Sequence, residues 1–357
     1  MQSLPKAAGA EQITEALRRS GVLGDGRVAE VAVEKSFPTL LSYFFRLRLT
    51  YEGPQAGAPP SLMLKTGLVG GPGGEWEGGR REVAFYTEVA SKMPGGLVPR
   101  CFDGHWDAGT KAWHLLLEDL TDSHLIATTW PLPPTLEQCE SIVRTQARFH
   151  AAWWDDPRLG TTVGEWPDGA AREQFMQRLA KQFTLFAEEV GDRLSVERRE
   201  LYRRLLDQAP SLFARYRSHR HMTIVHGDAH VWNCFLPRPG GTGNVGPREA
   251  MLFDWDAWRL GVGTADLAYT MAMHWYPERR QQIEGGLLDS YHDELVANGV
   301  QGYDRRALQE DYRLSVLWLI TLPIWQHAGK IPPVIWWNNL ERIHLAVDDL
   351  GCRELLA

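Results

Sequence analysis

The sequence predicts an α+β fold, in which a small antiparallel sheet is followed by a larger, mainly helical part. Three strand-like runs come first, at Arg27 to Lys35, Tyr43 to Tyr51 and Ser61 to Gly67, and from Thr135 onward the pattern turns mainly helical. Strands followed by a helical region are typical of this class. A chain of 357 residues exceeds the usual size of one compact core, so we expect two lobes.

The clearest strand pattern is the second run. Apolar side chains alternate there with polar ones, which is the period of two that a half-buried strand shows. One face would carry Phe45, Leu47, Leu49 and Tyr51, and the other Arg46, Arg48 and Thr50.

The remaining elements complete the small lobe and open the large one. A short helix is expected from Glu11 to Ser20 and another from Arg80 to Ala90, with strands near Leu97 to Trp106 and Lys111 to Asp119. We therefore divide the chain into residues 1–119 and 120–357. Within the helical part, a strand-like island runs from Met222 to Trp258.

Composition excludes several classes of protein. The net charge of −7, without a long run of Lys or Arg, argues against a nucleic-acid partner. The most apolar stretch, Leu314 to Trp325, contains Pro323 and is too short to span a bilayer, so we expect a buried helix and no membrane association. No secretory signal opens the chain, and the four cysteines are far apart, which favours the cytoplasm. The oligomeric state stays open.

The strand-like island carries the candidate catalytic residues. It contains Asp228, with Asn233 five positions later and Asp254 beyond. This spacing matches the catalytic loop and the metal-binding Asp of kinases. Phosphoryl transfer needs a carboxylate that accepts the proton of the attacking hydroxyl, and separate oxygen ligands for Mg²⁺. We predict Asp228 as the catalytic base and Asn233 and Asp254 as metal ligands.

Two other interpretations of this segment remain. Asp and Asn are common turn formers, and His226 and His230, four residues apart, are spaced as zinc ligands on a helix. Gly227 and the strand-like flanks argue against that helix. A hairpin whose loop runs from Pro237 to Pro247 would return Asp254 to Asn233.

The motif resembles a known superfamily. His226-Gly227-Asp228-x-His230-x-x-Asn233, Phe253-Asp254-Trp255 and Gly263 to Ala268 are similar to the signature of the aminoglycoside phosphotransferases and choline kinases. Leu116 to Leu120 and Phe149 to Trp154 resemble its ecdysteroid-kinase-like branch. The similarity extends from about Arg27 to the C-terminal helix, and the catalytic motif is its most specific part.

The resemblance implies a two-lobed, protein-kinase-like fold that uses ATP, with GTP not excluded, and Mg²⁺. Residues 1–119 would be the nucleotide-binding lobe and residues 120–357 the catalytic and substrate-binding lobe. Lys65 and Glu82 stand where the family has the lysine that binds the phosphates and its helix glutamate. Backbone groups near Glu118 and Leu120 would bind adenine.

The chain departs from the kinase pattern in one loop. The segment Lys35 to Leu40, which would cover the phosphates, has no glycine, so Ser36 and Thr39 would replace glycine there. The glycines between Gly67 and Gly79 follow Lys65 and lack the ending of a P-loop, so we interpret them as a mobile connection. Asp266 is predicted to cap a helix that begins at Leu267. Asp256 either supports a second metal or faces solvent on a strand.

The acceptor is a small molecule whose identity the sequence leaves open. Several of the 15 tryptophans fall in the helical part, where they form either core or the walls of a site for an apolar alcohol or a cationic amine. The net acidity slightly favours a cation. A non-catalytic binding protein of the same fold and a protein kinase are the alternative functions. The tryptophans considered for this role are seven of the 15, Trp153, Trp154, Trp275, Trp318, Trp325, Trp336 and Trp337.

Overall fold

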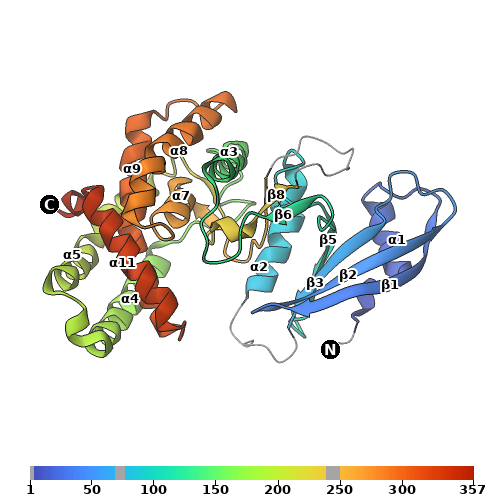
Figure 1. Cartoon of the computed structure of the whole chain (residues 1–357), viewed down its shortest axis with the longest axis horizontal. Coiled ribbons are helices and arrows are strands. Elements are labelled where there is room, and N and C mark those ends of the chain that lie inside the picture. Colours follow the sequence, from blue (N-terminus) through green and yellow to red (C-terminus); the bar gives the residue numbers. More distant parts are fainter. Residues whose placement is uncertain (1–3, 69–76, 239–249) are drawn as a thin grey trace. The chain divides into compact units, whose positions relative to one another are not determined.

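The computed structural model describes residues 4–68, 77–238 and 250–357. Its contacts divide the chain into two compact units, each described by itself below. The first unit comprises Met1–Ile126 and Cys234–Trp258, and the second comprises Ala127–Asn233 and Arg259–Ala357. The first unit contains the sheet and the second is mainly helical (Figure 1). The predicted α+β class is confirmed.

A five-stranded antiparallel sheet forms the first unit, in the order β1-β2-β3-β5-β4. All five predicted strands are present, with small shifts at their ends. The fourth begins only at Cys101, because Pro99 cannot donate a ladder hydrogen bond. The strands are β1 (Arg27–Pro38), β2 (Ser42–Glu52), β3 (Ser61–Gly67), β4 (Cys101–Trp106) and β5 (Trp113–Glu118).

The core of this unit lies between the sheet and helix α1 (Ala10–Arg19). Ile13 and Leu17 of the helix are fully buried in one cluster with Phe45 and Leu47 of β2. The predicted alternation along β2 is confirmed, since Phe45, Leu47 and Leu49 are buried and Arg48 and Thr50 are exposed. Figure 1 shows α1 alongside the blue strands β1 and β2.

Helix α2 (Gly78–Ala84) continues through a π-helical turn (Phe85–Val89) and packs on β4 and β5. Its start depends on glycine, because a Cβ on Gly79 would lie 2.2 Å from Nε1 of Trp113. Of the glycine-rich stretch between Gly67 and Gly79, residues 69–76 lie outside the described residues. The close approach of Trp113 shows that Gly79 is needed for packing at the start of α2.

A small second sheet joins three short strands, β6 (His124–Ile126), β8 (Cys234–Pro237) and β9 (Met251–Leu252). The predicted hairpin is present, because Cys234 pairs with Leu252 in antiparallel register. Most of its loop, residues 239–249, lies outside the described residues. Through β6, residues 234–258 join the first unit, whereas the boundary at 119/120 assigns them to the second lobe.

The second unit is a helical assembly with one short strand pair, β7 (Thr223–Val225) and β10 (Arg259–Gly261). Its main contacts join α3 to α8 and α7 to α9, through residues such as Val143, Leu287, Leu267 and Val316. The helices are α3 (Leu136–Ala152), α4 (Gly169–Val190), α5 (Val196–Leu212), α6 (Ala214–Arg217), α7 (Thr264–Met271), α8 (Pro277–Ala297), α9 (Arg305–Leu319), α10 (Leu322–Ala328) and α11 (Pro333–Asp349). Figure 1 labels most of them.

The apolar stretch predicted as one buried helix is two helices. Helix α9 ends at Leu319 and α10 begins at Leu322, with Pro323 in its first turn. Proline fits the first turn of a helix because its missing N–H would have no partner there. Within the described part of the chain, no helix combines the length and apolarity needed to cross a membrane.

Candidate active site

The loop that follows β7 holds Asp228 and Asn233 together. The Asn233 side chain donates from Nδ2 to the Asp228 carbonyl oxygen at 3.0 Å and to Asp228 Oδ2 at 3.1 Å. A 3₁₀ turn (Val231–Asn233) closes the loop, with the Asn233 N–H donating to the His230 carbonyl at 2.9 Å. Because its Nδ2 faces Asp228, the amide oxygen of Asn233 is left to accept another partner.

The side chain of Asp266 anchors the start of this loop. Its carboxylate accepts hydrogen bonds from the backbone N–H groups of His226 at 2.7 Å and Gly227 at 3.0 Å. The side chain is 2% exposed. Burial raises the pKa of Asp266, but the hydrogen bond and charge of His150, with Nε2 at 3.1 Å, outweigh burial, so that the pKa is lowered.

The predicted capping role of Asp266 is wrong. Helix α7 begins at Thr264, because the backbone at Gly263 is already helical, with φ −58° and ψ −25°. Asp266 is thus the third residue of the helix, and its carboxylate reaches the catalytic loop. This aspartate accepts hydrogen bonds from two backbone donors of the loop.

Tyr269 and His230 both contact the Asp228 carboxylate. The Tyr269 hydroxyl donates to Asp228 Oδ1 at 2.5 Å, and His230 Nε2 lies 3.5 Å from Oδ2. Tyr269 is one turn along α7 from Asp266, so one helix supports the loop and orients its carboxylate.

In the first unit, Lys65 bridges two carboxylates. Its Nζ donates to Glu82 at 2.7 Å and to Asp254 Oδ1 at 2.6 Å. Lys65 is 4% exposed and Glu82 1% exposed, so neither is the surface charge that sequence alone suggests. The expected position of Lys65 on a strand and of Glu82 on the following helix is as observed.

The charges of this triad are strongly coupled. Burial lowers the pKa of Lys65, but Glu82 and Asp254 more than offset it and the pKa is raised, so Lys65 stays charged. Burial raises the pKa of Glu82 to about 7, with Lys65 opposing. Asp254 has a φ of +68°, a conformation that costs free energy for any residue other than glycine. The next residue, Trp255, is buried, and its ring centroid lies 3.9 Å from that of Phe85, on which it stacks.

The turn between β1 and β2 uses Thr39 in place of glycine. Its N–H donates to the Ser42 carbonyl at 2.8 Å, and its hydroxyl accepts from the Ser42 N–H at 3.2 Å. Ser36 lies within β1, with its hydroxyl 3.4 Å from that of Tyr43. The hydroxyl of Thr39 therefore closes the turn.

Glu118 and Leu120 differ in how their backbone groups are used. The Glu118 N–H donates to the Arg100 carbonyl at 2.8 Å, and the Leu120 carbonyl accepts from His124 at 2.9 Å. Among the described residues, the Leu120 N–H has no protein acceptor. Of these groups, the Leu120 N–H is the hydrogen-bond donor that is open to a nucleobase.

His226 and Asp256 are not arranged as zinc ligands among the described residues. His226 is buried, and its Nδ1 accepts from the Asp228 N–H at 3.3 Å. Asp256 is half-buried in a turn, not on a strand. Within residues 4–68, 77–238 and 250–357, no group of three or more His, Cys, Asp or Glu side chains is arranged to hold a metal.

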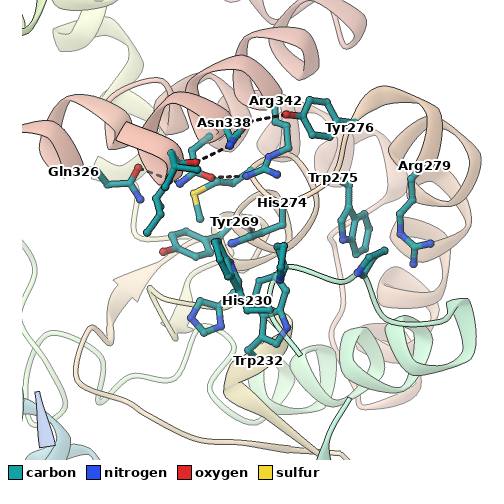
Figure 2. Close-up of a pocket in the computed structure, with 17 residues that line it drawn as sticks. His230, Trp232, Tyr269, His274, Trp275, Tyr276, Arg279, Gln326, Asn338 and Arg342 are labelled. Carbon is teal, nitrogen blue, oxygen red and sulfur yellow. Dashed lines mark hydrogen bonds between the residues drawn. The ribbon is translucent and has the colours of Figure 1, made fainter. Parts of the chain in front are cut away.

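A cavity of about 740 Å³ lies in the second unit (Figure 2). His230 and Tyr269, the two side chains that contact Asp228, are part of its wall. Trp275 is the one member of the predicted aromatic set that lines it, and Trp153 and Trp336 are buried in the core. Four further aromatic side chains also line the cavity, Trp130, Trp232, His274 and Tyr276.

Comparison with known families decides the classification. The sequence profile of the ecdysteroid kinase-like family matches residues 79–300. The chain belongs to the ecdysteroid kinase-like family. The predicted resemblance is confirmed, and membership places the chain among kinase-like phosphotransferases. A comparison with curated proteins gives no match.

Solved structures share the fold across almost the whole chain. A candidate aminoglycoside phosphotransferase from Ralstonia eutropha is 16% identical, with a TM-score of 0.56, and the match covers 95% of this chain and 97% of that one. Choline kinase from Cryptosporidium parvum is 12% identical, with a TM-score of 0.51 and coverage of 98% and 96%. An amicoumacin kinase in complex with AMP-PNP and Ca²⁺ is 14% identical, with a TM-score of 0.51 and coverage of 96% and 95%. The predicted kinase-like fold is confirmed.

Sequence reasoning missed Tyr269, His150 and the supporting role of Asp266. Asp266 and Tyr269 lie three positions apart on one helix, which places them on one face. That spacing was the available signal. His150 lies in the segment Phe149 to Trp154 that resembles the family, but nothing in the sequence shows that it forms a hydrogen bond with Asp266.

Proposed function

We propose that this member of the ecdysteroid kinase-like family transfers the γ-phosphoryl group of ATP to a hydroxyl group of a small molecule, with Mg²⁺ as cofactor. The observation that carries the proposal is the pair of hydrogen bonds from Asn233 to Asp228. They orient a carboxylate and an amide oxygen from one short loop, as phosphoryl transfer requires.

Asp228 is assigned as the base that accepts the proton of the acceptor hydroxyl. Tyr269 and Asn233 restrict its rotamer through their hydrogen bonds, so the carboxylate needs little reorganisation before the reaction. A positioned general base contributes roughly 10²- to 10⁴-fold to rate.

Asn233 and Asp254 are assigned as ligands of Mg²⁺. Both offer the oxygen donors that this hard cation prefers, and Mg²⁺ commonly takes one or two carboxylates plus phosphate oxygens. When bound, Mg²⁺ would neutralise negative charge on the phosphates. Lys65 would bind phosphate oxygens with Glu82 as its counter-charge, and the Leu120 N–H would donate to adenine or guanine.

Calorimetry tests the nucleotide and metal assignments together. We expect ATP to bind at least about tenfold more weakly in excess EDTA than with Mg²⁺, a difference of about 1.4 kcal/mol. GTP measured in parallel decides which nucleotide is the donor. Equal affinity with and without Mg²⁺ would count against Asn233 and Asp254 as ligands.

A transfer assay tests the activity itself. The protein is incubated with γ-labelled ATP, Mg²⁺ and a panel of aminoglycosides, choline-like amines, sugars, sterols and hydroxy acids. Label should appear in one small-molecule class. Binding of MgATP without transfer to any acceptor, including water, would favour the non-catalytic alternative.

A further inference from the structure

The cavity next to Asp228 carries positive charge and no negative charge. Its described lining includes the guanidinium groups of Arg279 and Arg342 and no Asp or Glu. The chain as a whole has 45 acidic and 38 basic residues, so the cavity is opposite in sign to the average surface. The lining is otherwise aromatic, apolar or neutral, as in most pockets for small molecules.

Arg342 lies at the centre of this arrangement. Its Nη2 donates to Asn339 Oδ1 at 2.8 Å, and its guanidinium carbon is 5.3 Å from the centroid of the Tyr276 ring. Its Nε is buried and has no hydrogen-bond partner in the part of the chain that the structure describes. Figure 2 shows Arg342 among the side chains that line the cavity.

Arg279 is the second cation of the wall. Its Nη2 donates to the Pro134 carbonyl, and its guanidinium carbon lies 5.3 Å from the centroid of the Trp275 ring. Its Nε is also buried without a partner among the described residues. Neither cavity arginine has a carboxylate partner within the described ranges.

Two other part-buried arginines of the same unit are paired with carboxylates, whereas Arg199 donates to the backbone carbonyls of Ala187, Gly191 and Leu194. Arg198 makes two hydrogen bonds to Glu341 at 2.6 and 2.8 Å, and Arg215 makes two to Asp311 at 2.6 and 2.7 Å. A charge removed from water without a counter-charge costs several kcal/mol. Burial accordingly lowers the pKa of Arg342. The cavity arginines therefore lack the carboxylate partner that Arg198 and Arg215 have.

We infer that the acceptor carries an oxyanion, a carboxylate on an apolar body, which pairs with Arg342 while its hydroxyl faces Asp228. This inference rests on the proposed function and names its substrate class. The planar guanidinium matches the two oxygens of a carboxylate, and the aromatic wall buries the apolar body. Choline-like amines and aminoglycosides would bring positive charge to two uncompensated cations.

His274 leaves this charge balance unchanged. Burial, with His230 adding to the effect, lowers the pKa of His274 to about 3, so His274 is neutral at neutral pH. Its Nδ1–H donates to the Tyr269 carbonyl at 2.8 Å. Nε2 of His274 is then an acceptor, able to receive a substrate hydroxyl.

Direct binding without nucleotide tests the inference separately from catalysis. Two sets of probes are compared by calorimetry, a linear ω-hydroxy fatty acid and a hydroxylated steroid acid, each with its methyl ester and with the amine of the same frame. For at least one frame we expect the acid to bind about 10- to 100-fold tighter than the ester, the usual worth of a charged hydrogen bond. The amine should bind most weakly.

Substitutions assign the preference to one side chain. Arg342→Met should reduce acid binding to the level of the ester and leave ester binding unchanged. Arg342→Glu should favour the amine. Arg306→Gln, an exposed arginine paired only with Glu310, is the control and should change nothing. Circular dichroism and thermal melting verify that each variant folds. The comparison of acid, ester and amine binding by the wild-type protein does not depend on the variants.

Four results would overturn the inference: equal binding of acid and ester, tightest binding of the amine, no binding by either frame, or an acid preference that survives in Arg342→Met. MgATP binding is measured on the same protein. If MgATP fails to bind while the acid preference is present, the proposed function fails and the oxyanion site stands. If MgATP binds and label transfers to an amine, the function stands and the oxyanion site fails.

Discussion

The carboxylate of Asp266 accepts a hydrogen bond from the backbone N–H of His226 at 2.7 Å. The contact joins α7 to the loop that carries Asp228, and the same carboxylate also accepts from Gly227. The position of the proposed base thus depends on a buried aspartate in another element.

Asp266→Asn should destabilise the second unit. The amide would direct N–H groups at backbone N–H groups in a buried site, so we expect a loss of about 2 to 4 kcal/mol in the free energy of unfolding. Urea denaturation measures it. Asp168→Asn is the matched control, because Asp168 caps α4 at the surface and Asn caps about as well. An Asp266→Asn protein as stable as wild type would contradict the anchoring role.

Tyr269→Phe should slow the reaction without weakening MgATP binding. The lost hydroxyl leaves the Asp228 carboxylate freer to rotate, so we expect about a tenfold fall in turnover, within the range of general-base effects. The Michaelis constants for ATP and for the acceptor should change little, a split that a general loss of structure would not produce. Tyr51→Phe, whose hydroxyl bonds only to the Pro59 carbonyl, is the control. An unchanged turnover would show that Tyr269 does not act through Asp228.

Lys65→Met should raise the Michaelis constant for ATP by about tenfold or more, because a charged contact to phosphate is worth at least about 1.4 kcal/mol. The constant for the acceptor should change little. The variant leaves Glu82 buried without a cation, so Lys65→Met with Glu82→Gln is expected to recover stability but not ATP binding. If only the acceptor constant moves, Lys65 does not contact the nucleotide.

Stability should fall on acidification through His344. Burial, helped by Arg198 and Arg353, lowers its pKa from 6.5 to about 3, so below about pH 6.5 the unfolded chain binds a proton that the folded protein does not. At about pH 5 this costs about 2 kcal/mol. His344→Phe, which can keep the packing against Tyr202, should remove that part of the loss.

The measurement is unfolding by urea at about pH 8 and about pH 5. His105→Phe, at an exposed histidine, is the control and should follow the wild-type pH dependence. The same loss of stability in His344→Phe as in wild type would contradict the assignment. Neither ring nitrogen of His344 has a hydrogen-bond partner among the described residues, so the substitution removes no hydrogen bond seen there.

Much of the fold could be predicted because local chemistry determines it. The alternation along Ser42–Glu52 specifies a half-buried strand, and the spacing from Asp228 to Asn233 reflects one turn that both residues stabilise. Such features depend on near neighbours in sequence. The pairing of Lys65 with Glu82 came from the family resemblance, and its burial came only from the structure.

The remainder depends on contacts between distant residues. Asp266 was interpreted from its own helix, yet its partners are 39 and 40 positions earlier. The cations of the cavity come from α8 and α11, and no local pattern shows that they lack a carboxylate. The net charge favours a cationic acceptor, whereas the described lining of the cavity carries two arginines. A sum over the chain does not report where the acidic residues lie.

The contrast between Asp228→Asn and Asp254→Asn tests the central claim most directly. Calorimetry with MgATP and turnover with the best acceptor are measured for both variants. We predict that Asp228→Asn keeps MgATP affinity while turnover falls by about 10²- to 10⁴-fold, or about 3 to 5 kcal/mol of barrier. Asp254→Asn should weaken metal-dependent binding and turnover together. Loss of MgATP binding in Asp228→Asn, with binding and rate intact in Asp254→Asn, would contradict the assigned roles.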